Sequence, residues 1–246
     1  MMLTRTTPTS IQSHVREQKG ILTIGRTPIV AEEFRALIAR QWGDEITVDA
    51  TSYNNPFSNT VNPALYRAVV VIVDSPQAFV ESIALIEGVR TNNMASIIVV
   101  VVTGSGTYNK MKSYLAGADY CLKLNNTPDE SAEVLSQIFT SPEWLTTDTL
   151  FLDPTRMYLI GNDKKLEVSF AEMKILEAFS QSRSLMLSHD EIARVMGLNV
   201  NFYDPRALEK SISRLRGKIK GMYGTNAIQS IRGYGYRLIR GLISIH

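Results

Sequence analysis

Short apolar runs alternate with helical stripes of apolar residues over the first half of the chain. The runs are rich in β-branched residues, as buried strands are, and they lie at 21–24, 45–50, 68–73, 96–102 and 120–123. Helical stripes lie at 29–41, 79–90, 108–116 and 128–139. We expect five strands alternating with five helices in all, which is typical of an α/β fold with a parallel sheet covered on both faces.

The pattern changes in the second half of the chain. Three short strands separated by turn residues are expected at 149–152, 157–160 and 165–168, and they predict a small antiparallel sheet. Residues 1–18 are polar and carry no periodicity, so we expect a disordered tail. Residues 141–148 contain few apolar positions and are expected to link a domain at 19–140 to another at 149–246.

One helix of the second half has two unlike faces. Asp204 is a suitable N-cap, and Pro205 suits the first helical position. An apolar stripe is formed by Leu208, Ile212, Leu215 and Ile219. A different face carries Arg206, Lys210, Ser213 and Arg214, with Arg216 at its flank. The helix can therefore pack on one face and meet DNA with the other, although an ordinary surface helix with solvated charges is the alternative.

A basic hairpin follows this helix. Residues 228–238 contain two short strand-like runs, and Gly233 and Gly235 between them permit a tight turn. Arg232 and Tyr234 are left at the tip of that turn. A basic helix in the major groove and an arginine reaching the minor groove can straddle a DNA duplex.

At this point the sequence resembles a known family, the OmpR/PhoB-type response regulators with a winged-helix DNA-binding domain. The resemblance covers roughly residues 149–240 and includes the run 231–237, Ile-Arg-Gly-Tyr-Gly-Tyr-Arg. Two capping boxes, Ser169 with Glu172 and Ser188 with Glu191, open the expected first and middle helices. The resemblance implies an α+β winged helix-turn-helix domain. It also implies that Lys210 and Arg214 face bases, whereas phosphates are contacted by Arg206, Ser211, Arg216 and Tyr236.

The charge is distributed unevenly along the chain. Residues 149–246 hold 15 Lys and Arg against 9 Asp and Glu, a net charge of +6, and residues 1–148 hold 11 against 15, a net charge of −4. Nucleic-acid affinity depends on neutralising phosphates, so the C-terminal half is the candidate DNA-binding half.

Composition excludes several classes of protein. A chain of 246 residues with 44% hydrophobic and 20% charged residues is ordinary for a globular protein with two modest domains. A single cysteine, Cys121, and three histidines predict no intrachain disulfide and no metal site. There is no apolar run of membrane-spanning length and no visible secretory signal, so a cytoplasmic protein without a membrane partner is expected.

The N-terminal half resembles a receiver domain, with a flavodoxin-like five-stranded parallel sheet, on three landmarks. Asp74 follows the third strand, where such domains carry the phosphoacceptor aspartate, and Thr103 follows the fourth strand. Lys123 matches the lysine of the fifth strand, although Leu124 replaces the usual proline. An aspartate before Ser-Pro also commonly ends a strand or caps a turn, which leaves a purely structural role for Asp74 open.

The first strand departs from the receiver pattern. Receivers need carboxylates directly after it to hold Mg²⁺, but the run 24–28 is Ile-Gly-Arg-Thr-Pro. Arg26 would place a cation where the metal belongs and could pair with Asp74 instead. We therefore expect a degenerate pocket of Asp74, Thr103, Lys123 and Arg26 that is not phosphorylated and holds no cofactor.

The leading hypothesis is a sequence-specific transcription regulator that acts independently of phosphorylation. It would bind promoter DNA, expected as direct repeats, as a homodimer formed through the receiver-like domain. A conventional phosphorylated response regulator remains an alternative, as does a winged-helix module that acts through protein contacts. RNA polymerase is one such partner, because some members of the family touch it with the loop corresponding to Gly197–Tyr203. An enzyme is disfavoured, because there is no phosphate-binding glycine motif.

Overall fold

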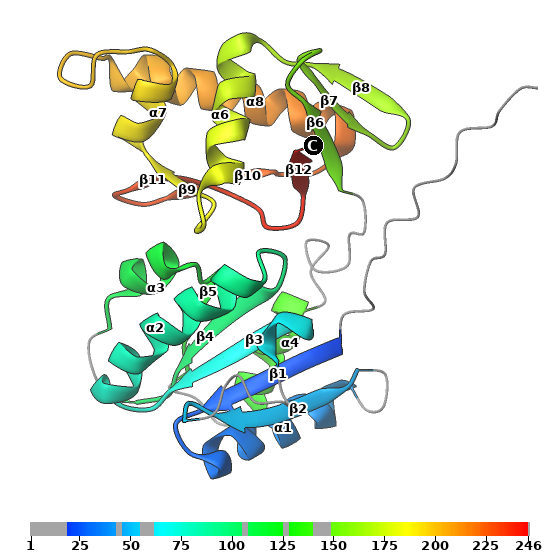
Figure 1. Cartoon of the computed structure of the whole chain (residues 1–246), viewed down its shortest axis with the longest axis vertical. Coiled ribbons are helices and arrows are strands. Elements are labelled where there is room, and N and C mark those ends of the chain that lie inside the picture. Colours follow the sequence, from blue (N-terminus) through cyan, green and yellow to red (C-terminus); the bar gives the residue numbers. More distant parts are fainter. Residues whose placement is uncertain are drawn as a thin grey trace, which may run out of the picture.

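The computed structural model describes residues 19–42, 46–54, 62–104, 108–124, 128–139 and 149–245. These residues form two domains that lie one above the other in Figure 1. The expected tail at 1–18 and the expected linker at 141–148 lie outside the described residues. Within the described residues, no helix has the length and apolar character needed to cross a membrane.

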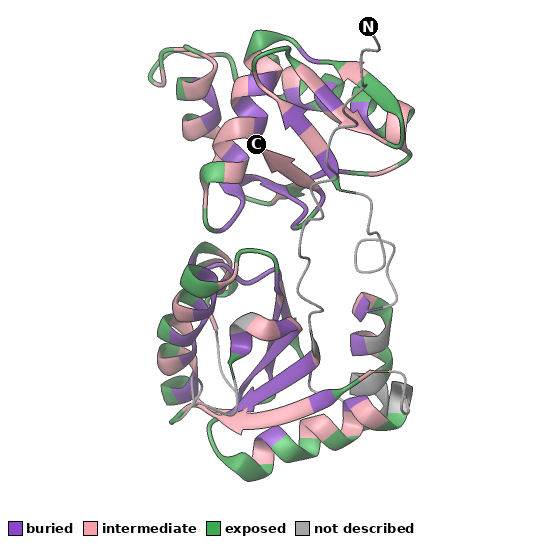
Figure 2. Cartoon of the chain, turned by 45° about the vertical axis from the view of Figure 1, so that its right-hand side comes forward, coloured by how far each residue is buried: buried purple, intermediate pink, exposed green. Residues whose placement is uncertain are grey.

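The N-terminal domain is built on a five-stranded parallel sheet. Its strands are β1 (Lys19–Gly25), β2 (Val48–Ser52), β3 (Tyr66–Val73), β4 (Ile97–Val102) and β5 (Tyr120–Lys123), in the order β2-β1-β3-β4-β5. This order is that of flavodoxin-like folds, as expected. Side chains of β3 and β4 are buried on both faces of the sheet, which explains their nearly continuous apolar sequences (Figure 2).

Four α-helices cover this sheet: α1 (Pro28–Trp42), α2 (Pro76–Asn92), α3 (Lys110–Ala116) and α4 (Pro128–Phe139). Helices α1 and α4 pack together, and α2 packs with α3 (Figure 1). The expected fifth helix is not among the described residues. Between β2 and β3 they contain the 3₁₀ helix η2 (Pro63–Leu65), and residues 55–61 lie outside the description.

The C-terminal domain combines two small sheets with three helices. A four-stranded sheet is formed by β6 (Leu150–Asp153), β7 (Tyr158–Gly161), β8 (Lys164–Glu167) and β12 (Ile243–Ile245). The helices are α6 (Phe170–Gln181), α7 (His189–Val195) and α8 (Pro205–Tyr223). A second sheet has the order β10-β11-β9, with bounds Ile228–Ile231, Gly235–Leu238 and Met186–Ser188. This is the winged-helix arrangement that the motifs predicted.

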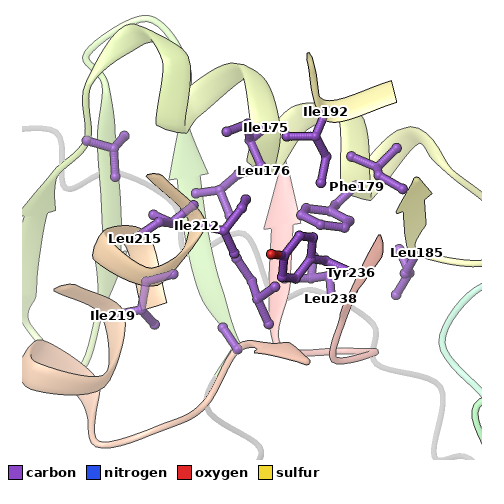
Figure 3. Packing of buried hydrophobic residues seen from close by; sticks show 14 of the residues in the cluster. Ile175, Leu176, Phe179, Leu185, Ile192, Ile212, Leu215, Ile219, Tyr236 and Leu238 are labelled. Carbon is purple, nitrogen blue, oxygen red and sulfur yellow. The ribbon is translucent and has the colours of Figure 1, made fainter. Parts of the chain in front are cut away.

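Local capping signals fix where these helices begin. Both expected capping boxes are confirmed, at Ser169 with Glu172 and at Ser188 with Glu191. The helices bury apolar residues in one core, which Figure 3 shows at close range with Phe179 and Ile212 beside Tyr236. Burying such a core is the main favourable term in the folding of the domain.

Two strands of the C-terminal domain escaped sequence analysis. Strand β9 pairs antiparallel with β11 about fifty residues later, and β12 pairs parallel with β6, which begins the domain. Each has three residues, too few to show a period, and each gains its hydrogen bonds from a partner far away in the sequence.

Candidate nucleic-acid interface

Helix α8 presents a basic face to solvent. Its start is set by Asp204, whose side chain accepts a hydrogen bond from the backbone N–H of Arg206 at 2.9 Å, and by Pro205 in the first turn. The apolar stripe Leu208, Ile212, Leu215 and Ile219 is fully buried, as predicted. Arg206, Lys210 and Arg214 are exposed on the remaining surface, so three cations of one helix face are available to a polyanion.

The hairpin of β10 and β11 projects a further cation beside this helix. Ile231 and Gly235 are paired across the strands, so Arg232, Gly233 and Tyr234 form the turn. Gly233 has φ +74°, the left-handed backbone that a side chain rarely adopts. A Cβ atom at Gly235 would lie 2.2 Å from the carbonyl oxygen of Leu187 on β9, so the wing can pack on β9 only with glycine there. Arg232 at the turn is exposed.

Arg216 and Tyr236 connect the helix to the wing. The guanidinium of Arg216 lies 5.2 Å from the centroid of the Tyr236 ring, and its Nη2 donates a hydrogen bond to Oγ of Ser230 at 2.8 Å. Tyr236 is only 6% exposed, its ring stands edge-on to His189 at 5.5 Å, and burial raises the pKa of its phenol. Both residues were expected to contact phosphates. In the structure, the guanidinium of Arg216 lies over the ring of Tyr236. Half-buried Arg216 is held in one orientation between α8 and the wing.

Ser211 occupies the same helix but makes a local hydrogen bond. Its hydroxyl donates to the carbonyl oxygen of Ala207 at 3.0 Å, one helical turn earlier. The hydroxyl oxygen keeps its lone pairs, and the side chain is partly exposed beside Lys210. The predicted helix and wing residues thus lie on two adjoining elements of one domain.

The N-terminal domain brings all four predicted pocket residues to one edge of the sheet, with Arg26 directly after β1. Asp74, Thr103 and Lys123 stand at or directly after the carboxyl ends of β3, β4 and β5, where ligands of such folds bind. Thr103 and Lys123 are exposed, whereas Oδ1 of Asp74 is buried without a hydrogen-bond partner among the described residues. Burial, and then the negative charge of Asp74, raises the pKa of the nearby Tyr53 phenol.

The expected ion pair between Arg26 and Asp74 is wrong. Nε of Arg26 lies 3.9 Å from Oε2 of Glu81 on α2, and both side chains are well exposed. Arg26 keeps its guanidinium at the surface, while Asp74 buries a carboxylate oxygen. The residues here do not fit the Mg²⁺ of receiver domains, because the position after β1 supplies a cation in place of carboxylate ligands. Across the described part of the chain, no group of three or more His, Cys, Asp or Glu gathers in a way that would hold a metal ion.

Comparison with known proteins identifies the type of the C-terminal domain. Residues 163–238, from the β7–β8 turn to the end of the wing, match the family described as "Transcriptional regulatory protein, C terminal". The C-terminal domain is therefore of the kind found in transcriptional regulatory proteins of the OmpR/PhoB type, and the chain is similar to such regulators.

Relatives of the chain match it across both domains. It is 22% identical to the transcriptional regulatory protein PhoP of Escherichia coli K12 over 172 residues, which are 68% of this chain and 77% of PhoP. It is 24% identical to PcoR of Escherichia coli over 179 residues, which are 69% and 77% of the two chains. Among solved structures, the response regulator DrrB of Thermotoga maritima is 16% identical, with 90% of this chain and 99% of DrrB covered and a TM-score of 0.33.

Sequence analysis missed a second set of charged residues. Arg90, Asp119, Arg237 and Arg240 are all buried. Only Arg237 belongs to a motif, the wing run 231–237, and that motif signals DNA binding rather than a buried cluster. Buried arginines are rare unless they are paired. The available signal was the presence of two arginines, at 237 and 240, around an apolar strand end that should otherwise be core.

Proposed function

We propose that this protein binds specific duplex DNA sequences and regulates transcription as a homodimer, without aspartyl phosphorylation. The observation that carries the proposal is the exposed set of cations on α8 and at the wing turn: Arg206, Lys210, Arg214 and Arg232. An α-helix fits the major groove of B-DNA, and an arginine beside it suits a narrow minor groove.

The residues proposed to contact DNA fall into two groups, those that read bases and those that bind phosphates. Lys210 and Arg214, in the middle of α8, read base edges, and Arg232 enters the minor groove. Arg206, Ser211, Arg216 and Tyr236 bind phosphates, which position the domain without reading sequence. The stacking of Arg216 on Tyr236 supports this division, because a guanidinium held in place loses less freedom when it meets a phosphate.

The test of base reading is Arg214→Ala, measured by fluorescence anisotropy on the operator and on operators with single base changes. Loss of a bidentate base contact costs about 1–3 kcal/mol and relaxes discrimination at one position. Lys220→Ala is the matched control, because Lys220 is exposed on the same helix but near its C-terminal end. Wild-type affinity and specificity in Arg214→Ala would remove Arg214 from the major groove.

Independence from phosphorylation follows from the first strand. Without carboxylates after β1, no oxygen cage would hold the Mg²⁺ that positions a phosphoryl group at Asp74. Arg26, the residue directly after β1, pairs with Glu81 of α2 instead of supplying a metal ligand. A regulator with such a pocket binds its operator in the absence of any phosphodonor.

Dimerisation is proposed through the receiver-like domain. Helix α3 exposes Lys110, Lys112 and Leu115, and α4 exposes Glu133, so a twofold contact can join opposite charges around an apolar residue. The two winged helices are then brought to adjacent sites on one duplex. Strict twofold symmetry would match inverted repeats, so the expected direct repeats require the two winged helices to depart from that symmetry. Sedimentation velocity of the unphosphorylated protein tests the point, and a monomer at all concentrations would exclude it.

A contact with RNA polymerase is the proposed second role. Phe202, in the loop between α7 and α8, is 86% exposed, and aromatic side chains are enriched in protein–protein interfaces. Its neighbour Tyr203 donates a hydrogen bond to Asp190 at 3.2 Å, which braces the loop against α7. Phe202→Ala should reduce transcription from a target promoter while leaving DNA affinity unchanged. Because its ligand would be chromosomal DNA, we place the protein in the cytoplasm.

A further inference from the structure

A buried cluster of charged residues joins the two domains. Asp119, directly before β5, is 6% exposed, and Arg90 on α2 of the same domain is fully buried. Arg237 on β11 and Arg240 just after it come from the winged-helix domain, and they are 8% and 7% exposed. Charged side chains are seldom buried to this degree without specific partners.

Asp119 has a partner on each carboxylate oxygen. Its Oδ1 accepts a hydrogen bond from Nε of Arg240 at 2.7 Å, and its Oδ2 accepts from the backbone N–H of Ile98 at 2.8 Å and from Nη2 of Arg90. Burial favours the neutral acid, but the charges of Arg240 and Arg90 outweigh it and hold the pKa of Asp119 below its ordinary value. Asp119 therefore stays ionised within the interface.

Arg240 donates from its remaining nitrogens to both domains. Nη1 donates to the carbonyl oxygen of Met94 in the receiver-like domain at 2.8 Å, and Nη2 donates to that of Arg183 in the winged-helix domain at 3.1 Å. One planar guanidinium thus bonds three groups in fixed directions, which a different packing of the domains would not reproduce.

Arg237 makes a second bond from the winged-helix domain to Asp119. Its Nη1 donates to the backbone carbonyl oxygen of Asp119, and its Nη2 donates to Oε1 of Gln229 at 2.8 Å. The guanidinium also lies 5.5 Å and 5.7 Å from the ring centroids of Tyr114 and Tyr120. Arg237 is thus bonded both to the receiver-like domain and to its own hairpin.

The receiver-like domain contacts the face of the wing that points away from the core of the winged helix. Successive side chains of a strand point to opposite faces, so Tyr236 enters the core of the winged helix while Arg237 reaches the receiver-like domain. Figure 1 shows β9, β10 and β11 between that domain and the helices α6 and α8. With the domains docked in this way, Arg206, Lys210, Arg214 and Arg232 remain exposed.

We propose that Asp119, Arg237 and Arg240 form an interdomain clamp that holds the receiver-like domain in one orientation while leaving the DNA-facing side chains open. Because the desolvation of buried ions offsets much of their attraction, the clamp fixes geometry more than it adds affinity between the domains. The receiver-like domain then acts as a rigid brace on the wing, and its docking does not inhibit DNA binding.

The test is the distance between spin labels on the two domains of the full chain, measured by double electron–electron resonance. Labels are placed at Glu87→Cys on α2 and Lys220→Cys on α8, both exposed positions, with buried Cys121 changed to alanine in every sample. One narrow distance is expected, and Arg240→Gln should turn it into a broad distribution. Arg237→Gln is the independent second variant, and Arg194→Gln, an exposed arginine on α7, is the matched control that keeps the narrow distance.

A narrow distance that survives both Arg240→Gln and Arg237→Gln would overturn the clamp, and so would a broad one in the parent protein. The second measurement is affinity for a single operator half-site, and this arm alone rests on the proposed DNA binding. Unchanged affinity of Arg240→Gln is expected. Tighter binding by Arg240→Gln would show that docking inhibits DNA binding and would overturn the open arrangement. If neither the parent protein nor any variant bound the half-site, the proposed function would be refuted. The clamp would then be judged by the distance measurement alone.

Discussion

Replacing Arg206 by glutamine should change DNA affinity and protein stability in opposite directions. Arg206 lies in the first turn of α8, where the unpaired N–H groups give the helix a partial positive charge, and the first turn holds no acidic residue. A cation is unfavourable there. Arg206→Gln should therefore raise the free energy of unfolding by about 0.3–1 kcal/mol, the usual size of such an effect on an exposed helix end.

The loss in DNA binding has a calculable salt dependence. The Asp204 cap bonds the backbone N–H of Arg206, so it survives the substitution, and only the exposed side chain changes. Removing one phosphate contact should lower the slope of log affinity against log salt by about 0.9. Between about 50 and 200 mM salt, the ratio of wild-type to variant affinity should then change by about 3.5-fold, since a fourfold change in salt is raised to that power.

Two measurements on the same samples test the expected loss of DNA affinity and the expected gain in stability. Fluorescence anisotropy titrations of an operator half-site at several salt concentrations give the slopes, and thermal unfolding gives the stabilities. Arg156→Gln is the control, because Arg156 is a 76% exposed arginine of the same domain that pairs with Asp153 in the turn after β6. Equal slopes for the two variants would refute the phosphate contact. A lower melting temperature for Arg206→Gln would show that Arg206 serves the fold instead.

Three further outcomes are expected. Arg232→Ala should weaken binding most on sites flanked by A·T runs, where the minor groove is narrow, and an equal loss on G·C-flanked sites would make Arg232 a plain backbone contact. Acetyl phosphate with Mg²⁺ should leave the mass and DNA affinity of the protein unchanged, and Asp74→Asn should bind DNA normally; a phosphoryl adduct on Asp74 that tightens binding would reject this. Gly235→Ala should destabilise the domain by about 1–3 kcal/mol in urea unfolding, because its Cβ would meet the backbone of β9. Gly221→Ala, with nothing within 4 Å of the added atom inside α8, should instead stabilise by roughly 0.5–1 kcal/mol, and equal effects would contradict the steric account.

The sequence alone determined the elements whose signals are local. The cap at Asp204, the apolar stripe of α8 and the glycine at the wing turn each depend on residues within a few positions, so their pattern is complete in a short window. Strands β3 and β4 of the N-terminal sheet were readable for the same reason, because burial on both faces demands continuous apolar runs. The basic face of α8 followed directly, since helical periodicity separates it from the buried stripe.

Tertiary structure decided what depends on partners far apart in the chain. Strand β9 exists because β11 supplies its hydrogen bonds, and Arg26 meets Glu81 rather than Asp74 because α2 brings that carboxylate to the surface beside it. Asp119 lies 121 positions from Arg240 in the bond that joins the two domains. An aspartate before a short strand and an arginine after another look like ordinary surface residues in sequence. Only the docking of the two domains buries them together, and in a medium of low dielectric each then requires the other.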